Sequence, residues 1–209
     1  MGHGVEAALT ASVCLGGLRG GRRRGESLFD QVTSTNAALL DYATNGAKDD
    51  FVTGIIGRLD LRHGLLEMFN AGHAAPYLLR DGEVAAVRVP AGLPLGMFAA
   101  SVYESTQLQL VPGDRLVFVT DGMLERRVAA VDLPAAIQST RDLHPREVVR
   151  ALADSALAAA GHVLEDDATL LCLDWHGEHS GDRDTSSGAD PERASDPLDQ
   201  PAPTTSGQP

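Results

Sequence analysis

The sequence predicts an α+β protein in which helices pack on antiparallel β-sheet. Two helical patterns come first, a series of short apolar segments separated by tight turns follows, and two further helical patterns precede a last apolar segment. Strands joined by two- or three-residue turns pair antiparallel, whereas a parallel sheet needs strands that alternate with helices. With 209 residues, of which 43% are hydrophobic, the chain can bury one sizeable core.

Two helices are predicted in the first quarter of the chain. The first begins at Val5 in an Ala-, Leu- and Val-rich segment, and the glycine pairs 16–17 and 20–21 are expected to end it. The arginines at 22–24 then predict a solvated loop. The second helix is expected over 27–42 because apolar residues recur there near helical spacing. These residues are Leu28, Val32, Leu39 and Leu40.

Strands are predicted through the middle of the chain. The turn dipeptides His63-Gly64 and Asp81-Gly82 each separate two apolar segments, as in hairpins, and 90–96 is a Pro- and Gly-rich loop. Residues 102–110 alternate polar and apolar side chains, as a half-buried strand does. The expected strands cover 51–61, 65–72, 76–80, 83–89, 102–110 and 116–119.

The last part of the chain predicts two helices, one strand and a tail. The helices are expected over 132–139 and 144–161, and the strand over 170–175. Residues 176–209 contain seven acidic and two basic residues and five of the eleven prolines. A segment this poor in large apolar side chains cannot offset the entropy of ordering, so 176–209 is predicted to be a disordered acidic tail.

Composition narrows the classes of partner. A formal net charge of −12 argues against nucleic acid or an anionic membrane as the main partner. No apolar run approaches the ~20 residues of a membrane span, and the N-terminus does not have the charge pattern of a signal peptide. Cys14 and Cys172 both lie in apolar surroundings and are expected to be buried free thiols. A cytoplasmic protein is therefore predicted.

Carboxylates stand at the ends of two predicted strands. Asp121 directly follows the apolar run 116–119, and Asp166-Asp167 precede the run 170–175. If these strands are antiparallel neighbours, the carboxylates meet at one edge of the sheet, where they repel one another unless a cation is bound. Oxygen-only ligands favour Mg²⁺ or Mn²⁺ over zinc. Asp121-Gly122 as an ordinary turn is the alternative interpretation.

Six segments of the chain form an ordered set of motifs: GHGVEAA at 2–8, FVT at 51–53, NAGHAAPYLL at 70–79, GLPLG at 92–96, GDRLVFVTDGMLE at 113–125 and DDATLL at 166–171. Taken in order and at their approximate spacing, they resemble the SpoIIE-like branch of the PPM-type (type 2C) metal-dependent Ser/Thr protein phosphatases. The resemblance covers residues 1–175, and each segment alone would be a weak signal.

The resemblance implies a fold and an activity. The fold is an αββα sandwich of two antiparallel sheets flanked by helices, formed by a phosphatase domain over 1–175. The site is a dinuclear Mn²⁺ or Mg²⁺ centre whose metal-bridging water attacks the phosphorus, because two cations lower the pKa of the water and neutralise charge on the phosphoryl oxygens. The implied substrate is phospho-Ser or phospho-Thr on a bacterial regulatory protein, such as a phosphorylated anti-sigma-factor antagonist.

Individual residues carry over from the family motifs. Asp121 matches the metal-binding aspartate of the TDG motif. Asp166 matches a second metal ligand, with Asp167 beside it. His3 matches the histidine of the GHG motif, which lies near the phosphate or only shapes a backbone turn. His73, in the NAGH segment, is expected to have a structural role.

The chain departs from the family pattern at its start. Family members have an aspartate ligand directly before the GHG motif and a further acidic residue upstream, but Met1 occupies the position before Gly2-His3-Gly4. The resemblance therefore predicts a domain that lacks its N-terminal strands and first aspartate ligand. Three interpretations follow: the recorded start is too late, the chain is a fragment of a longer phosphatase, or it is a catalytically inactive remnant that acts as a protein-interaction domain in partner-switching signalling.

Overall fold

A computed structural model of the chain describes residues 5–44, 51–123, 131–161 and 167–177. These residues belong to the first of two units, Met1–Glu178 and His179–Pro209. The predicted tail lies outside the described residues from residue 178 onward. Among the helices that the structure describes, none is long and apolar enough to cross a membrane.

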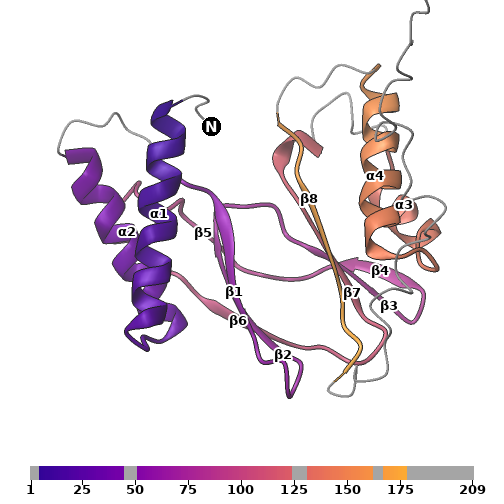
Figure 1. Cartoon of the computed structure of the whole chain (residues 1–209), viewed down its shortest axis with the longest axis horizontal. Coiled ribbons are helices and arrows are strands. Elements are labelled where there is room, and N and C mark those ends of the chain that lie inside the picture. The colour runs from indigo at the N-terminus through magenta and orange to yellow at the C-terminus, as the bar shows by residue number, and fades with distance from the viewer. Residues whose placement is uncertain (1–4, 45–50, 124–130, 162–166, 178–209) are drawn as a thin grey trace, which may run out of the picture. The chain divides into compact units, whose positions relative to one another are not determined.

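The described elements follow the predicted order (Figure 1). The helices are α1 (Val5–Arg23), α2 (Leu28–Thr44), α3 (Leu133–Ser139) and α4 (Pro145–Ala159), with a single 3₁₀ turn, η1 (Asp121–Met123). The strands are β1 (Gly54–Leu59), β2 (Leu65–Ala71), β3 (Tyr77–Arg80), β4 (Glu83–Ala86), β5 (Ala91–Gly92), β6 (Ser105–Gln109), β7 (Arg115–Val119) and β8 (Leu170–Asp174).

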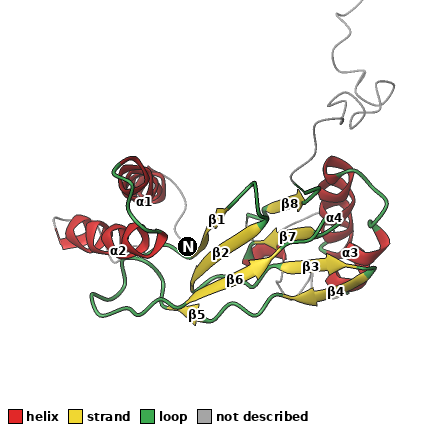
Figure 2. Cartoon of the chain, turned by 90° about the horizontal axis from the view of Figure 1, so that it is seen from below, coloured by secondary structure: helices red, strands yellow, loops and turns green. Residues whose placement is uncertain are grey.

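The strands form two four-stranded sheets (Figure 2). One contains β1, β2, β5 and β6, with β2 bonded to the other three, and the second has the order β4-β3-β7-β8. All pairings are antiparallel except the two-residue ladder between β2 and β5. The predicted sandwich of antiparallel sheets flanked by helices is therefore confirmed, while the predicted loop 90–96 contains one short strand.

The two sheets pack face to face, and each is covered by helices on its other face. On β2, Leu66 and Met68 join the cluster between the sheets, whereas Phe69 and Ala71 pack with α1 and α2. On β7, Leu116 lies between the sheets, and its neighbours Val117 and Val119 pack with α3 and α4. Successive strand residues point to opposite faces, so strands buried on both faces need the continuous apolar runs that this sequence has.

The glycine pairs do not end α1, contrary to the sequence prediction. The helix continues to Arg23, so the arginines at 22 and 23 form its last turn and are not loop residues, although they are exposed. A Cβ on Gly17 would lie 2.7 Å from Thr35 Oγ1, and a Cβ on Gly21 would lie 2.8 Å from Gln31 Cγ. These glycines therefore let α1 approach α2 closely, and this packing offsets their poor helix propensity.

Adjacent glycines of α1 should respond to alanine with opposite signs. Nothing lies within 4 Å of a Cβ on Gly16, so Gly16→Ala should raise the free energy of unfolding by about 0.5–1 kcal/mol through the lower entropy of the unfolded chain. Gly17→Ala forces a methyl group against the fully buried Thr35 and should lower the free energy of unfolding by about 1–3 kcal/mol. Urea unfolding of both variants measures this. Equal shifts would contradict the packing role of Gly17.

A buried asparagine ties α2 to the GLPLG segment. Asn36, which is 4% exposed, accepts a hydrogen bond from Gly96 N at 2.8 Å and donates one to Phe98 O at 3.0 Å. The Tyr103 hydroxyl lies 3.4 Å from Asn36 Oδ1. A buried polar side chain with several partners holds one arrangement of the surrounding backbone. Asn36 therefore fixes the loop that follows β5.

Both cysteines are free thiols. Cys14 is buried, as predicted, and burial raises its pKa. Cys172 of β8 is only half-buried, because it packs at the margin of the cluster formed with α3 and α4. Partial burial, together with the nearby charge of Asp174, still raises the Cys172 pKa to about 11. Neither thiol is therefore activated as a nucleophile.

Candidate metal centre

Pairing of β7 with β8 brings the TDG and DDAT segments to one sheet edge. The two strands are antiparallel, with Val119 opposite Leu170, and the ladder continues through a hydrogen bond from Thr120 N to Thr169 O at 3.1 Å. The end of β7 and the start of β8 are therefore neighbours. The strand arrangement on which the predicted metal site depended is present.

Asp121 is the first residue of η1, directly after β7. Its neighbours Val119, Gly122 and Met123 are buried, and Met123 belongs to the cluster beneath α3 and α4. Met123 N donates to Thr120 O at 3.0 Å and closes the turn. Asp121 itself is exposed. Buried neighbours on both sides thus hold the backbone, while the carboxylate stays at the surface.

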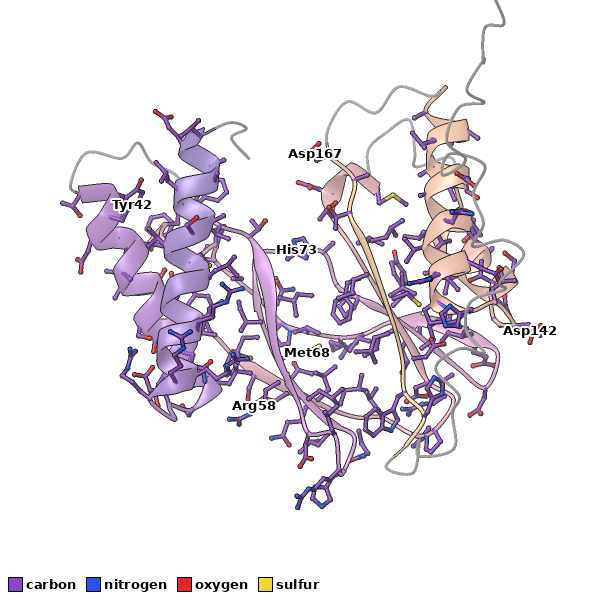
Figure 3. All side chains as sticks on the ribbon, in the orientation of Figure 1. Tyr42, Arg58, Met68, His73, Asp142 and Asp167 are labelled. Carbon is purple, nitrogen blue, oxygen red and sulfur yellow. The ribbon has the colours of Figure 1, made fainter. Side chains whose placement is uncertain are left out.

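Asp167 lies beside this turn, three residues before β8 begins (Figure 3). It is exposed, and its backbone passes so close to Gly122 that a Cβ there would lie 2.6 Å from Asp167 O and 3.0 Å from Asp167 C. A residue without a side chain is therefore needed at position 122, because the Asp167 backbone occupies the space of a Cβ. The absence of a side chain at 122 lets the two acidic segments pack directly against each other.

The donor set at this edge suits a hard divalent cation. Asp121 and Asp167 are both exposed carboxylates on adjacent segments, and oxygen ligands of this kind favour Mg²⁺ and Mn²⁺. The predicted site residues Asp166 and His3 lie outside the described residues. Within the described ranges, no group of three or more His, Cys, Asp or Glu side chains gathers as a metal site.

An asparagine side chain holds the backbone of the NAGH segment, while the structural role expected of the His73 side chain stays a prediction. The side chain of the buried Asn70 binds the backbone of His73 twice: His73 N donates to Asn70 Oδ1 at 2.7 Å, and Asn70 Nδ2 donates to His73 O at 3.0 Å. Gly72 has φ +70°, and a Cβ there would lie 3.1 Å from Pro94 Cγ. The NAGH and GLPLG segments therefore pack against each other. His73 follows β2, in the other sheet from Asp167 (Figure 3).

Alanine at Gly122 should damage both stability and the site. Because the atoms that it would meet belong to the Asp167 backbone, no side-chain rotation relieves the contact, and we expect Gly122→Ala to lower the free energy of unfolding by about 1–3 kcal/mol. Gly54→Ala is the control, since Gly54 also stands at the end of a strand, as the first residue of β1, but nothing lies within 4 Å of its added Cβ. Thermal unfolding of the two variants decides: an unchanged midpoint for Gly122→Ala would contradict the close approach.

Comparison with known proteins identifies the family and the fold. The family model described as Stage II sporulation protein E (SpoIIE) matches residues 1–176. Protein IcfG of Synechocystis is 30% identical over 77 residues, which are 37% of this chain and 12% of IcfG. The chain therefore spans a small part of this relative.

Solved structures of other proteins have a fold similar to that of this chain. The RsbU and RsbW domains of Rv1364c from Mycobacterium tuberculosis match with TM-score 0.68 and 24% identity over 85% of this chain and 50% of that one. The PP2C phosphatase domain of SpoIIE from Bacillus subtilis, with a fragment of its regulatory domain, matches with TM-score 0.69 and 19% identity over 84% of this chain and 52% of that one.

A match of similar quality covers nearly the whole of a third structure. The serine/threonine phosphatase PstP/Ppp of M. tuberculosis has TM-score 0.65 and 17% identity over 84% of this chain and 85% of that one. Identities this low show the fold alone, whereas the family model spans every described residue except Gly177. The chain therefore belongs to the SpoIIE family and has the fold of the PPM-type Ser/Thr phosphatases.

Proposed function

We propose that the chain is a metal-dependent protein phosphatase that hydrolyses phospho-Ser or phospho-Thr on a regulatory protein. The observation that carries this proposal is the junction of β7 and β8, which sets the exposed Asp121 beside the exposed Asp167 in a chain of the SpoIIE family. An edge of buried strands that ends in surface carboxylates is stable as a scaffold and accessible to a large substrate.

The proposed ligands are Asp121, Asp166 and Asp167, with Mn²⁺ or Mg²⁺ as the cation. A bound cation would supply charge stabilisation for the phosphoryl oxygens. The protein's own part is to hold the carboxylates at fixed points: Asp121 through the buried turn η1, and Asp167 through its backbone contact with Gly122. Since a phosphate monoester is anionic and the chain carries a net charge of −12, substrate would be repelled without the cation. His3 is proposed to lie near the phosphate.

The proposed substrate is a phosphorylated protein, such as an anti-sigma-factor antagonist. Two related structures support a protein partner: one joins RsbU and RsbW domains in a single chain, and the other is a cell fate determinant with a regulatory domain. Both site carboxylates described are exposed, so a phosphorylated residue on a folded partner can reach them.

Metal removal tests this function. The purified chain should hydrolyse p-nitrophenyl phosphate and a phosphoserine-containing protein with Mn²⁺, lose the activity with EDTA, and regain it when excess Mn²⁺ is added. Calorimetry should show Mn²⁺ binding under the same conditions. If the chain shows no hydrolysis and binds no Mn²⁺ at millimolar concentration, the proposal is overturned in favour of a non-catalytic interaction domain in partner-switching signalling.

A further inference from the structure

The β7–β8 ladder changes its hydrogen bonding at Thr120, where β7 ends. In a regular antiparallel ladder a hydrogen-bonded pair exchanges two backbone bonds. Thr120 N does donate to Thr169 O, at 3.1 Å. The return bond is different: Thr169 N donates to the side-chain Oγ1 of Thr120 at 2.8 Å, and Thr120 O accepts from Met123 N at 3.0 Å instead.

The threonine hydroxyl therefore takes the place of its own backbone carbonyl. Because the carbonyl is free of the ladder, it closes η1, the turn that begins with Asp121. Because the hydroxyl accepts from Thr169 N, β8 stays paired across the same position. One residue thus allows β7 to leave the sheet while its partner strand remains in register.

The same hydroxyl also reaches the second acidic segment. Thr120 Oγ1 donates to Asp167 O at 3.3 Å while it accepts from Thr169 N, and a hydroxyl can do both at once. Asp167 O is also the atom nearest to the position of a Cβ on Gly122. Thr120 and Gly122, the first and third residues of the TDG segment, therefore both lie against one carbonyl, so the backbone of Asp167 is held from two sides.

We propose that Thr120 is a positioning residue that fixes Asp167 relative to Asp121 for cation binding. This inference rests on the proposed function for its metal, and on the described hydrogen bonds for its geometry. Thr120 touches neither cation nor substrate in this assignment. Its hydroxyl acts through the two backbones that carry the carboxylates, as groups that orient metal ligands do.

Paired substitutions separate the hydroxyl from the shape of the side chain. Thr120→Val keeps the branched shape and removes the hydroxyl, while Thr120→Ser keeps the hydroxyl and removes a methyl group. Thr106→Val is the control, because Thr106 is a half-buried strand residue of β6 in the other sheet. All three variants and the wild type are first compared by thermal unfolding, so that a global loss of structure is recognised.

Amide hydrogen exchange of the metal-free proteins, followed by NMR, measures the positioning directly. Thr120→Val should speed exchange at the Thr169 amide by about fivefold or more, the factor that one net hydrogen bond represents. Thr120→Ser and Thr106→Val should leave that amide unchanged. The same rate at Thr169 in Thr120→Val and wild type would overturn the inference.

Mn²⁺ titration by calorimetry then tests the consequence for the site. Thr120→Val should weaken Mn²⁺ binding by about tenfold, as losses of ligand-orienting groups do, and Thr120→Ser should restore it. Faster exchange with unchanged Mn²⁺ affinity would also overturn the inference, because Thr120 would then hold only the strand. If the wild type binds no Mn²⁺, the proposed function fails, and the exchange rates alone decide whether Thr120 holds this junction.

Discussion

Replacing Arg115 with methionine should lower the free energy of unfolding by about 3–5 kcal/mol. Arg115 is the first residue of β7 and is 5% exposed. Its guanidinium forms two hydrogen bonds with Asp174, Nε to Oδ1 at 2.6 Å and Nη2 to Oδ2 at 2.8 Å. It also donates to Thr140 O at 2.7 Å and to Leu143 O at 2.6 Å. One side chain therefore joins β7, β8 and the connection from α3 to α4.

The expected loss is large because two of the partners have little access to water: the Asp174 side chain is 14% exposed and Thr140 is 5% exposed. Methionine fills much of the space but donates nothing, so the carboxylate of Asp174 and the carbonyls of Thr140 and Leu143 would all lose a charged donor. The hydrogen bonds with Asp174 raise the pKa of Arg115, because the carboxylate stabilises the charged guanidinium. Removing one member of such a pair leaves an uncompensated charge.

Arg141→Met is the control for Arg115→Met. Arg141 also pairs with an aspartate, Asp142, at 3.2 Å, but its side chain is 62% exposed and that of Asp142 is 87% exposed. Exposed pairs contribute little, so this variant should change the free energy of unfolding by less than about 1 kcal/mol. Urea unfolding measures the free energies of unfolding of both variants, and equal m-values make the two comparable. Similar small losses for the two arginines would contradict the role assigned to the buried pair.

Patterns within short segments were sufficient to predict the order of helices and antiparallel strands, whereas the two-sheet sandwich was implied by the family resemblance. Apolar runs such as 116–119 are continuous because each strand is buried on both faces, and the turn dipeptides separate them. The glycines of α1 misled the prediction for the opposite reason. Gly17 is explained by its contact with α2, and Gly21 by contacts with α2 and with Glu26 just before it, and a local rule for helix ends includes neither.

In the candidate site too, the placement of the carboxylates could be predicted from the sequence, whereas the tertiary contacts that hold them could not. Strand ends placed Asp121 and Asp167 on one edge as soon as β7 and β8 were taken as antiparallel neighbours. The atoms that hold them were not predictable, because Thr120 Oγ1 and Gly122 act on backbone groups more than 40 positions away in the chain. Asn36 was missed likewise, although a lone asparagine among the apolar residues of α2 is a signal for a buried hydrogen-bonding role.

Asp121→Asn should lower the Mn²⁺-dependent hydrolysis of p-nitrophenyl phosphate by more than about a hundredfold, if the proposed function holds. An amide keeps the size and one oxygen of the side chain but lacks the negative charge that binds a divalent cation. Asp121 is exposed and follows a buried strand, so the fold does not depend on its charge. Steady-state kinetics with a titration of Mn²⁺ measures the loss.

Stability separates loss of the metal ligand from loss of the fold. In metal-free protein, Asp121→Asn changes an exposed side chain, so its free energy of unfolding should stay within about 0.5 kcal/mol of that of the wild type. Asp154→Asn, at an exposed position of α4, should leave both activity and stability unchanged. Full activity in Asp121→Asn would remove Asp121 from the site. If Asp121→Asn instead strongly lowers the free energy of unfolding, the Asp121 carboxylate is needed by the fold and not by a cation. Asp121-Gly122 would then be a structural turn.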